Sequence, residues 1–236
     1  FEFSKPIINF SPGPTQFPKV LLKQIKEEFI NSPNGITPLE ISHRSPEFVN
    51  ILSSVNENMK KLMKIPADFK ILWTHGGGHG QFSAIPMNLM PLITNNKRAN
   101  YIVSGTWSNR AYEEACKVIN AYNSLNSDIL PLDHKSITMD CLNISNDDAY
   151  VYFCSNETVN GIEFKKDGIP YPDRDMLKGA RSIIDMSSDF TMKNIDWTCV
   201  DVAFACTSKN LGIPGATVVI IRNDILDKVH NKNYIP

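Results

Sequence analysis

Apolar residues in the first part of the chain recur at helical spacing. One such stretch begins at Pro18 and runs to about Asn31, and a second begins at Pro46. Proline suits the first turn of a helix, and Ser45 can cap the second stretch by accepting a hydrogen bond from one of its free N–H groups. The pattern therefore predicts two helices, preceded by a rigid, proline-containing N-terminal arm over residues 1–17.

From residue 69 onward the pattern changes to short apolar runs separated by glycine-rich or helical segments. Strands that alternate with helices are typical of a mostly parallel sheet covered by helices on both faces. The sequence therefore predicts one α/β domain over residues 18–236, without an internal repeat. The expected strands are Phe69–Trp73, Tyr101–Val103, Ala149–Cys154, Ser182–Asp185, Val200–Cys206 and Ala216–Ile221.

The composition is that of a globular protein that can bury a substantial core, because 42% of the 236 residues are hydrophobic and 21% are charged. The 24 basic and 25 acidic residues are scattered, so no basic stripe favours nucleic acid or an anionic membrane. No apolar run is long enough to span a bilayer, and the five cysteines show no CxxC spacing. We therefore expect a cytoplasmic protein with reduced thiols, in which recognition of phosphate is local.

A glycine-rich segment follows the first expected strand. His75–Phe82 contains four glycines, which let the backbone approach an anion while the next helix presents its free N–H groups. The spacing is neither the GxxxxGKS/T pattern of nucleotide hydrolases nor the GxGxxG pattern of dinucleotide-binding proteins. The segment is typical of a phosphate cradle, and the alternative is a tight strand-to-helix turn without a ligand.

The next two expected strands end near side chains that could contact a planar ligand. Trp107 follows the second strand, where its ring could stack on another ring, although most tryptophans belong to the core. Thr158 follows the third strand, where its hydroxyl could bond a ring oxygen, and the alternative is a simple turn. In sheets of this kind ligands bind beyond the carboxyl ends of the strands, so both residues belong to the same expected rim.

An aspartate and a lysine complete this rim. Asp185 ends an apolar run, where an unpaired carboxylate is costly and is expected to have a cationic partner. Lys209 follows the next run, 24 residues further on. A carboxylate can keep the ring nitrogen of pyridoxal 5'-phosphate protonated, and a lysine amine can condense with its aldehyde. A lone lysine in such a place is usually only solvated, so the prediction of this cofactor rests on the combination.

These stretches together resemble the phosphoserine aminotransferases, pyridoxal-phosphate enzymes of the aspartate-aminotransferase (type I) fold. The resemblance runs nearly end to end. Glu40–Ser45 matches the family's E-I-S-H-R-S motif, and His75–Phe82 is similar to H-G-G-G-x-G-Q-F. The segments Asn156–Thr158, Asp185–Ser188 and Lys209–Gly212 then follow in the family's order.

The resemblance implies a role for each residue on the rim. Lys209 would hold the cofactor covalently and then carry the proton between substrate and cofactor. Asp185 would pair with the pyridinium nitrogen, Trp107 would stack on the ring, and Thr158 would bond its phenolic oxygen.

The same resemblance implies how anionic groups are bound. Backbone at Gly78 and His79 would hold the cofactor phosphate, with Ser208 at a position where the family usually has glutamine. His79 stands where arginine is common. His43 and Arg44 would bind anionic groups of the substrate, in the family across a dimer interface; on composition alone they would be an exposed loop.

The implied activity is that of a homodimeric transaminase. It would move an amino group between L-glutamate and 3-phosphohydroxypyruvate to give O-phospho-L-serine and 2-oxoglutarate. The resemblance also implies a smaller C-terminal domain that follows the large domain and that is absent from this sequence, which ends at Pro236. The alternatives are a non-catalytic cofactor-binding core or dimerisation fragment, and a cofactor-free nucleotide-binding domain that uses the glycines alone.

Overall fold

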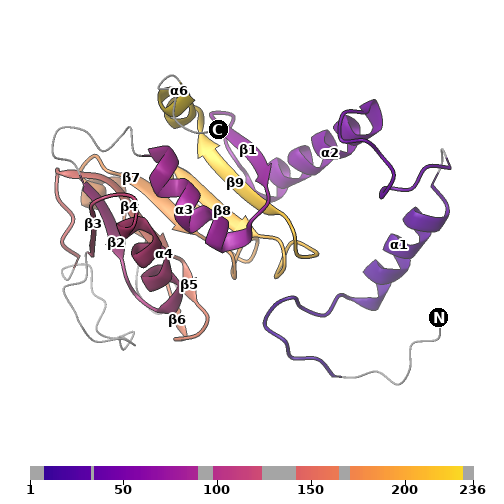
Figure 1. Ribbon diagram of the computed structural model, residues 1–236, viewed down its shortest axis with the longest axis horizontal. Helices are drawn as coiled ribbons and strands as arrows, with labels where there is room; N and C mark the ends of the chain where they lie inside the picture. The colour runs from indigo at the N-terminus through magenta and orange to yellow at the C-terminus, as the bar shows by residue number, and fades with distance from the viewer. Residues whose placement is uncertain (1–7, 33–34, 90–97, 124–141, 165–170, 231–236) are drawn as a thin grey trace. The chain divides into compact units, whose positions relative to one another are not determined.

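The computed structural model describes residues 8–32, 35–89, 98–123, 142–164 and 171–230. The chain divides into two compact units, Phe1–Ile65 and Pro66–Pro236 (Figure 1). This division differs from the expected arm over residues 1–17 and domain over 18–236, which stays a prediction.

The described part of the first unit contains the two expected helices, α1 (Lys19–Ile30) and α2 (Pro46–Met63). Ser45 caps α2, because its side chain accepts a hydrogen bond of 3.3 Å from the N–H of Phe48. Few of the described side chains in this unit are buried, and those of α2 that are buried are Met59 and Met63. Most of the apolar surface of the two helices is therefore open to solvent in this chain.

The second unit is built on a mostly parallel sheet, as predicted. Within the described residues it has seven strands in the order β1-β9-β8-β7-β4-β2-β3. Strands β8, β7, β4, β2 and β3 run parallel to one another, whereas β9 runs antiparallel to both of its neighbours, β8 and β1. Their bounds are β1 (Phe69–Thr74), β2 (Arg98–Ile102), β3 (Ala121–Asn123), β4 (Asp148–Cys154), β7 (Arg181–Asp185), β8 (Val202–Cys206) and β9 (Thr217–Arg222).

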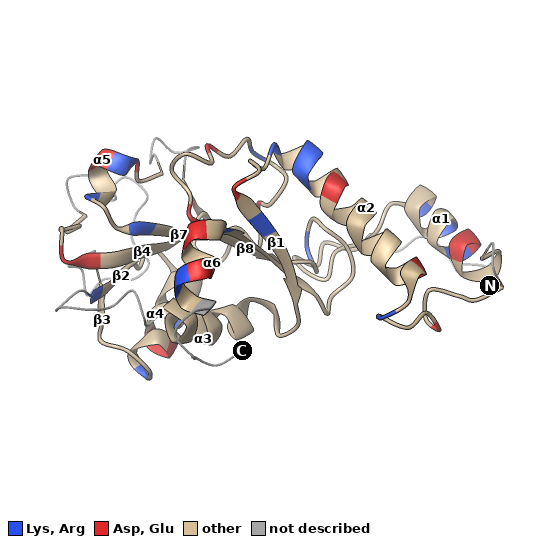
Figure 2. Ribbon diagram, turned by 90° about the horizontal axis from the view of Figure 1, so that it is seen from above, with Lys and Arg blue, Asp and Glu red and all other residues tan. Residues whose placement is uncertain are grey.

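Helices cover both faces of this sheet. The helices α3 (Gly77–Leu89), α4 (Thr106–Cys116) and α6 (Asn223–His230) contribute apolar side chains to one core cluster with alternate residues of the strands. The short helix α5 (Arg174–Leu177) lies on the opposite side of the sheet from α3 and α4 (Figure 2). Strand residues of this second face, such as Phe153, pack on Phe164 and Tyr171.

Strand β2 begins at Arg98, three residues before the apolar run that predicted it. Two of its first three residues, Arg98 and Asn100, are polar, and Asp148 at the start of β4 pairs with both. Arg98 Nε lies 2.8 Å from Asp148 Oδ1, and Asn100 Nδ2 donates to Oδ2 across 2.8 Å. A strand whose polar donors find a partner in this way can extend beyond its apolar run.

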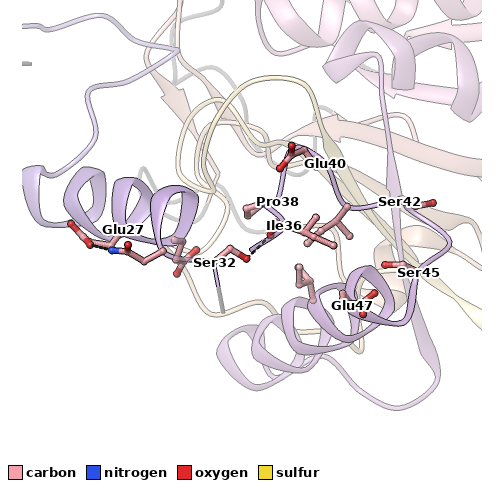
Figure 3. A pocket seen from close by; sticks show the side chains of 12 residues that line it. Glu27, Ser32, Ile36, Pro38, Glu40, Ser42, Ser45 and Glu47 are labelled. Carbon is pink, nitrogen blue, oxygen red and sulfur yellow. Dashed lines mark hydrogen bonds between the residues drawn. The ribbon is translucent and has the colours of Figure 1, made fainter. Parts of the chain in front are cut away.

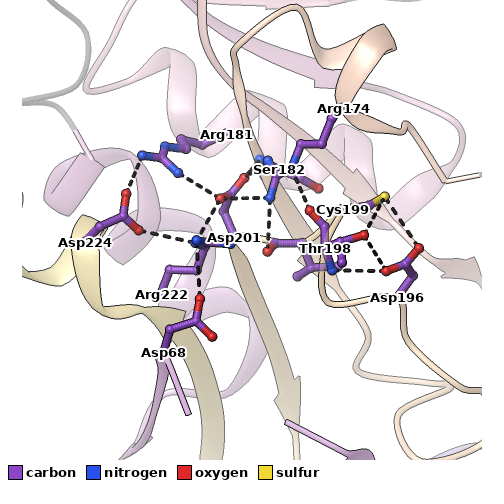
Figure 4. A network of polar contacts seen from close by, with 11 residues as sticks. Asp68, Arg174, Arg181, Ser182, Asp196, Thr198, Cys199, Asp201, Arg222 and Asp224 are labelled. Carbon is purple, nitrogen blue, oxygen red and sulfur yellow. Dashed lines mark hydrogen bonds and ion pairs between the residues drawn. The ribbon is translucent and has the colours of Figure 1, made fainter. Parts of the chain in front are cut away.

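The buried carboxylate of Asp201 joins several elements at the edge of the sheet where β7 begins and β9 ends (Figure 4). Arg174 Nη1 lies 2.6 Å from its Oδ2, and Arg181 Nη1 lies 3.0 Å from its Oδ1. Arg222 Nε lies 3.7 Å from the same oxygen, and the N–H of Ser182 donates to Oδ2 across 2.8 Å. This cluster lies at the amino ends of the parallel strands β7 and β8, away from their carboxyl ends, so we assign it to stability rather than to ligand binding.

In the part of the chain that the structure describes, every helix is too short or too polar to cross a bilayer.

Candidate active site

The glycine-rich segment forms the beginning of α3, directly after β1. Gly76 and Gly77 have φ angles of +96° and +63°, which side-chain-bearing residues rarely adopt. Gly80 donates its N–H to the carbonyl of Gly76 across 3.0 Å, which closes the first helical turn. The N–H groups before it, at Gly78 and His79, therefore belong to the helix N-terminus and can donate hydrogen bonds to an anion.

Asp185 is the last residue of β7, and its side chain is only 3% exposed. The N–H of Ser187 donates to its Oδ1 across 2.9 Å. Burial raises the pKa of Asp185 to about 6 in spite of the hydrogen bonds from Ser187, and the nearby carboxylates of Glu157 and Asp189 add to the rise. Ionising this carboxyl group thus costs more than it does in water, and a neighbouring cation would offset that cost.

Ser187 connects Asp185 to the glycine segment and to β8. Its Oγ accepts a hydrogen bond of 3.2 Å from the N–H of Cys206, the last residue of β8. A Cβ atom built on Gly78 would lie 3.9 Å from the same Oγ. The carboxylate and the predicted phosphate cradle are therefore neighbours. Sequence reasoning quoted Ser187 only as part of a motif and missed this role.

The side chains of Trp107 and Thr158 contact each other. The indole Nε1 of Trp107 donates to Oγ1 of Thr158 across 3.2 Å. The imidazole of His79 lies edge-on to the same indole, with ring centroids 6.1 Å apart. The start of α4, the turn after Glu157 and the start of α3 thus converge on one aromatic side chain.

Lys209 lies in the turn that follows β8, and its Nζ is 5.9 Å from the centroid of the Trp107 ring. The side chain is half-buried. Asn210 fixes the turn, because its Nδ2 donates to the carbonyl of Phe190 across 3.0 Å. Ser208 precedes the lysine, and its hydroxyl lies 3.7 Å from Sγ of Cys206. The predicted lysine and the predicted stacking ring therefore lie on the same side of the site.

Glu157 is a buried residue of the site that sequence reasoning did not single out. It lies on β5 (Asn156–Glu157), which pairs with β6 (Ile162–Glu163) in a separate hairpin. Its oxygens accept hydrogen bonds from the N–H groups of Trp107 and Ser108. A carboxylate just after the end of β4 was the available signal, but only the tertiary structure shows what it contacts.

His43 and Arg44 belong to the first unit, and both side chains are exposed. A cavity of about 920 Å³ lies within the same unit, and its lining residues include Ser42 and Ser45 on either side of them in the sequence (Figure 3). Its lining includes the carboxylates of Glu27, Glu40 and Glu47. Acidic walls repel anionic ligands, so this cavity does not fit a phosphorylated substrate, and we do not assign the candidate site to it.

The residues on the rim of the sheet fit pyridoxal 5'-phosphate. A pyridinium would stabilise the ionised form of a buried carboxylate with a raised pKa, and the beginning of α3 offers N–H groups to a phosphate. An indole and a lysine amine, 5.9 Å apart, fit a planar aldehyde. The donor set therefore matches each chemical part of the predicted cofactor.

Comparison with known proteins places this arrangement in a family. Residues 7–234 match the family model described as aminotransferase class-V. The chain therefore belongs to the class-V aminotransferase family. Within that family, its similarity is to the phosphoserine aminotransferases.

Relatives of known sequence include the phosphoserine aminotransferases of Haemophilus ducreyi and Drosophila melanogaster. The first is 38% identical over 94% of this chain and 59% of its own length. The second is 35% identical over 94% of this chain and 58% of its own length. The chain thus spans less than two thirds of the length of these relatives.

Solved structures agree with this. The pyridoxal-phosphate-bound phosphoserine aminotransferase of Trichomonas vaginalis superposes with a TM-score of 0.82 at 35% identity, over 93% of this chain and 59% of that one. The phosphoserine aminotransferase of Bacillus circulans subsp. alkalophilus gives a TM-score of 0.81 at 29% identity, over 95% of this chain and 59% of that one. The large α/β domain is therefore the part of the fold that this chain shares with them.

Proposed function

We propose that the protein containing this chain is a pyridoxal-phosphate-dependent transaminase. It would transfer the amino group between L-glutamate and 3-phosphohydroxypyruvate, giving O-phospho-L-serine and 2-oxoglutarate. The observation that carries the proposal is the position of two residues at the same edge of the sheet. Asp185, a buried carboxylate, ends β7, and Lys209, an amine, follows the adjacent parallel strand β8. The relatives named phosphoserine aminotransferase support the choice of substrates.

The cofactor, when bound, supplies an aldehyde that condenses with amines and a protonated ring that accepts electrons. Asp185 would hold the ring nitrogen, and the N–H groups of Gly78 and His79 would hold the phosphate, with a contribution from Ser208. Trp107 would cover one face of the ring, and Thr158 would bond its phenolic oxygen. Each group keeps one part of the cofactor in a fixed orientation.

Lys209 would have two tasks. Its Nζ would hold the aldehyde until an amino acid arrives, and the freed amine would then take the proton from Cα of that amino acid. The half-buried position of the side chain and its place in a turn fixed by Asn210 favour a defined approach of Nζ. Restricting the approach of a base to one direction lowers the entropic cost of proton transfer.

The substrate anions would be bound by His43 and Arg44. Arg44 offers a planar, permanently charged guanidinium that can bind a phosphate or a carboxylate with two hydrogen bonds. We further propose that two copies of the protein form a cytoplasmic homodimer in which these side chains reach the site of the partner copy. Apolar side chains exposed on α1 and α2, such as Val20 and Val55, support such an assembly.

The proposal is tested by borohydride reduction of the protein in the presence of pyridoxal phosphate, followed by peptide mass mapping. Reduction should attach the cofactor to Lys209, and Lys209→Ala should remove the label. Lys117→Ala, at an exposed lysine that pairs with Glu114, is the matched control and should keep it.

Turnover separates the proposal from its alternatives. Release of 2-oxoglutarate from glutamate, and of phosphoserine when 3-phosphohydroxypyruvate is added, is expected for the transaminase. Labelling of Lys209 without either product would instead indicate a non-catalytic cofactor-binding core. Absence of labelling in the wild type would refute the proposal. It would favour a nucleotide-binding domain that holds no pyridoxal phosphate and binds its ligand through the glycine-rich segment alone.

A further inference from the structure

Glu157 is a fully buried carboxylate, and its two oxygens accept hydrogen bonds from N–H groups in the first turn of α4. Its Oε2 accepts a hydrogen bond of 2.8 Å from the N–H of Trp107, and its Oε1 accepts one of 2.7 Å from the N–H of Ser108. Burial raises the pKa of Glu157, and these hydrogen bonds oppose the rise. A negative charge at a helix N-terminus is also favoured by the helix dipole.

The backbone is shaped to admit this carboxylate. A Cβ atom built on Gly105, the N-cap of α4, would lie 2.7 Å from Cδ of Glu157 and 2.7 Å from Oδ1 of Asn160. The φ angle of Gly105 is −172°, which any residue can adopt, so the need for glycine here is one of space. The close approach of the β5–β6 turn to α4 is therefore a specific feature of this chain.

Asn160 completes the attachment on the other side of the turn. Its Oδ1 accepts hydrogen bonds from both the N–H and the hydroxyl of Thr106, at 2.8 and 3.0 Å. The N–H groups that open α4, at Thr106, Trp107 and Ser108, are thus all bonded to side chains of the turn. Since these N–H groups are already bonded to protein side chains, the start of α4 has none of them left for a bound phosphate, in contrast to the role proposed for the start of α3.

Trp107 is fixed at two points by consecutive residues of that turn. Its backbone N–H bonds to Glu157, and its indole Nε1 donates to Thr158 across 3.2 Å. Two attachments define both the position and the direction of the indole plane. The same indole faces Nζ of Lys209 at 5.9 Å and the ring of His79 at 6.1 Å.

We propose that Glu157 is a positioning residue for the cofactor. By clamping the start of α4 to the β5–β6 turn, it sets the indole plane of Trp107 and the hydroxyl of Thr158 relative to Lys209. This inference rests on the proposed function, because the object being positioned is the pyridoxal-phosphate ring. Glu157 itself touches only protein groups, so its effect on the ring passes through Trp107 and Thr158.

The first measurement needs no cofactor. In the full chain, ¹H–¹⁵N NMR follows the indole N–H of Trp107, which is assigned with Trp107→Phe. Glu157→Gln replaces one acceptor oxygen by an amide NH₂ that faces a backbone N–H, and it should shift this signal and speed its hydrogen exchange at least about tenfold. Glu113→Gln removes the same charge from an exposed position on α4 and should leave the signal in place.

The second measurement uses the bound cofactor. Glu157→Gln should weaken pyridoxal-phosphate binding about tenfold and change the circular dichroism of the bound cofactor, while Glu113→Gln changes neither. Glu157→Asp keeps the charge but withdraws it by one methylene, so it should behave like Glu157→Gln if position is what matters. An unchanged Kd and dichroism in Glu157→Asp would overturn the proposal and leave only an electrostatic role.

The outcomes also separate this inference from the proposed function. A Glu157→Gln protein that is less stable but has the wild-type indole signal, Kd and dichroism would show a merely structural cap and overturn the inference. If the wild type itself fails to bind the cofactor, the proposed function is refuted. The indole signal of the cofactor-free variants then still decides whether Glu157 positions Trp107.

Discussion

The hydroxyl oxygen of Tyr152 on β4 lies 3.5 Å from Oδ2 of Asp185 on the neighbouring strand β7, and both side chains are buried. The contact is at the long limit of a hydrogen bond, so it compensates little of the cost of burying the carboxylate. Burial accordingly raises the pKa of Asp185 to about 6. The cofactor-free protein therefore carries a carboxyl group that ionises at a higher pH than an ordinary aspartate, at a cost in folding free energy.

Asp185→Asn should stabilise the cofactor-free protein, and more so at higher pH. A carboxyl with a native pKa of about 6 and an unfolded pKa near 3.9 binds more protons in the native state between these values. The wild type thus loses free energy of unfolding as pH rises from about 4 through about 6, by at most ~3 kcal/mol. Urea unfolding at pH 5 and pH 8 should show the advantage of the variant growing by ~1 kcal/mol.

Asp227→Asn, at an exposed position of α6, is the control and should differ from the wild type by less than about 0.5 kcal/mol at both pH values. Saturating pyridoxal phosphate should reverse the order of wild type and Asp185→Asn, because the wild-type carboxylate then has its cation. A variant that is less stable than the wild type at pH 8 without cofactor would contradict the prediction.

Asp201→Ala should destabilise the protein by about 3–5 kcal/mol. The substitution leaves Arg174 and Arg181 without the buried carboxylate that both contact, and an uncompensated charge is costly at such a site. Urea unfolding of Asp201→Ala beside Asp227→Ala, which removes an exposed carboxylate, measures the difference. A loss below ~1 kcal/mol would mean that solvent readily replaces the carboxylate.

Gly105→Ala should cost about 1–3 kcal/mol, because the added methyl group would collide with Glu157 and Asn160 at 2.7 Å. Gly212→Ala is the control, since a Cβ atom there meets nothing within 4 Å and its φ is ordinary. Thermal unfolding of the two variants should separate them by several degrees. Equal melting temperatures would show that the β5–β6 turn moves away from α4 without cost.

Gly77→Ala should destabilise the start of α3 through its backbone alone. The φ angle of +63° is a left-handed conformation that costs a residue with a Cβ atom about 1–2 kcal/mol, although the space around it is open. Gly80→Ala, in the same turn, has ordinary backbone and a contact of 3.5 Å, so it should cost less. Denaturant unfolding of the pair tests this, and a more stable Gly77→Ala would be the contrary result.

Ser208→Gln should tighten the binding of pyridoxal phosphate by up to about tenfold, which corresponds to ~1.4 kcal/mol. A glutamine amide reaches further than the serine hydroxyl and can donate to the cofactor phosphate. Absorbance titration of Ser208→Gln, with Ser208→Ala as the control, measures the change. If Ser208→Gln binds no better than Ser208→Ala, this side chain does not reach the phosphate.

Local features of the sequence were enough to place much of the fold. Ser45 and Pro46 marked the start of α2 because capping and the fixed φ of proline act within one helical turn. The apolar runs located most strands of the sheet, since a strand buried on both faces is apolar along its length. The places of Asp185 at the end of β7 and of Lys209 after β8 were likewise readable, because each ends or follows such a run.

Tertiary structure decided what depends on partners far along the chain. Strand β2 starts at Arg98 because Asp148, fifty residues later, accepts hydrogen bonds from the side chains of Arg98 and Asn100. Glu157 reaches the start of α4 because Gly105 leaves it room. Neither contact leaves a periodic pattern, since burying a polar group requires one matching partner in space rather than a repeated spacing in the sequence.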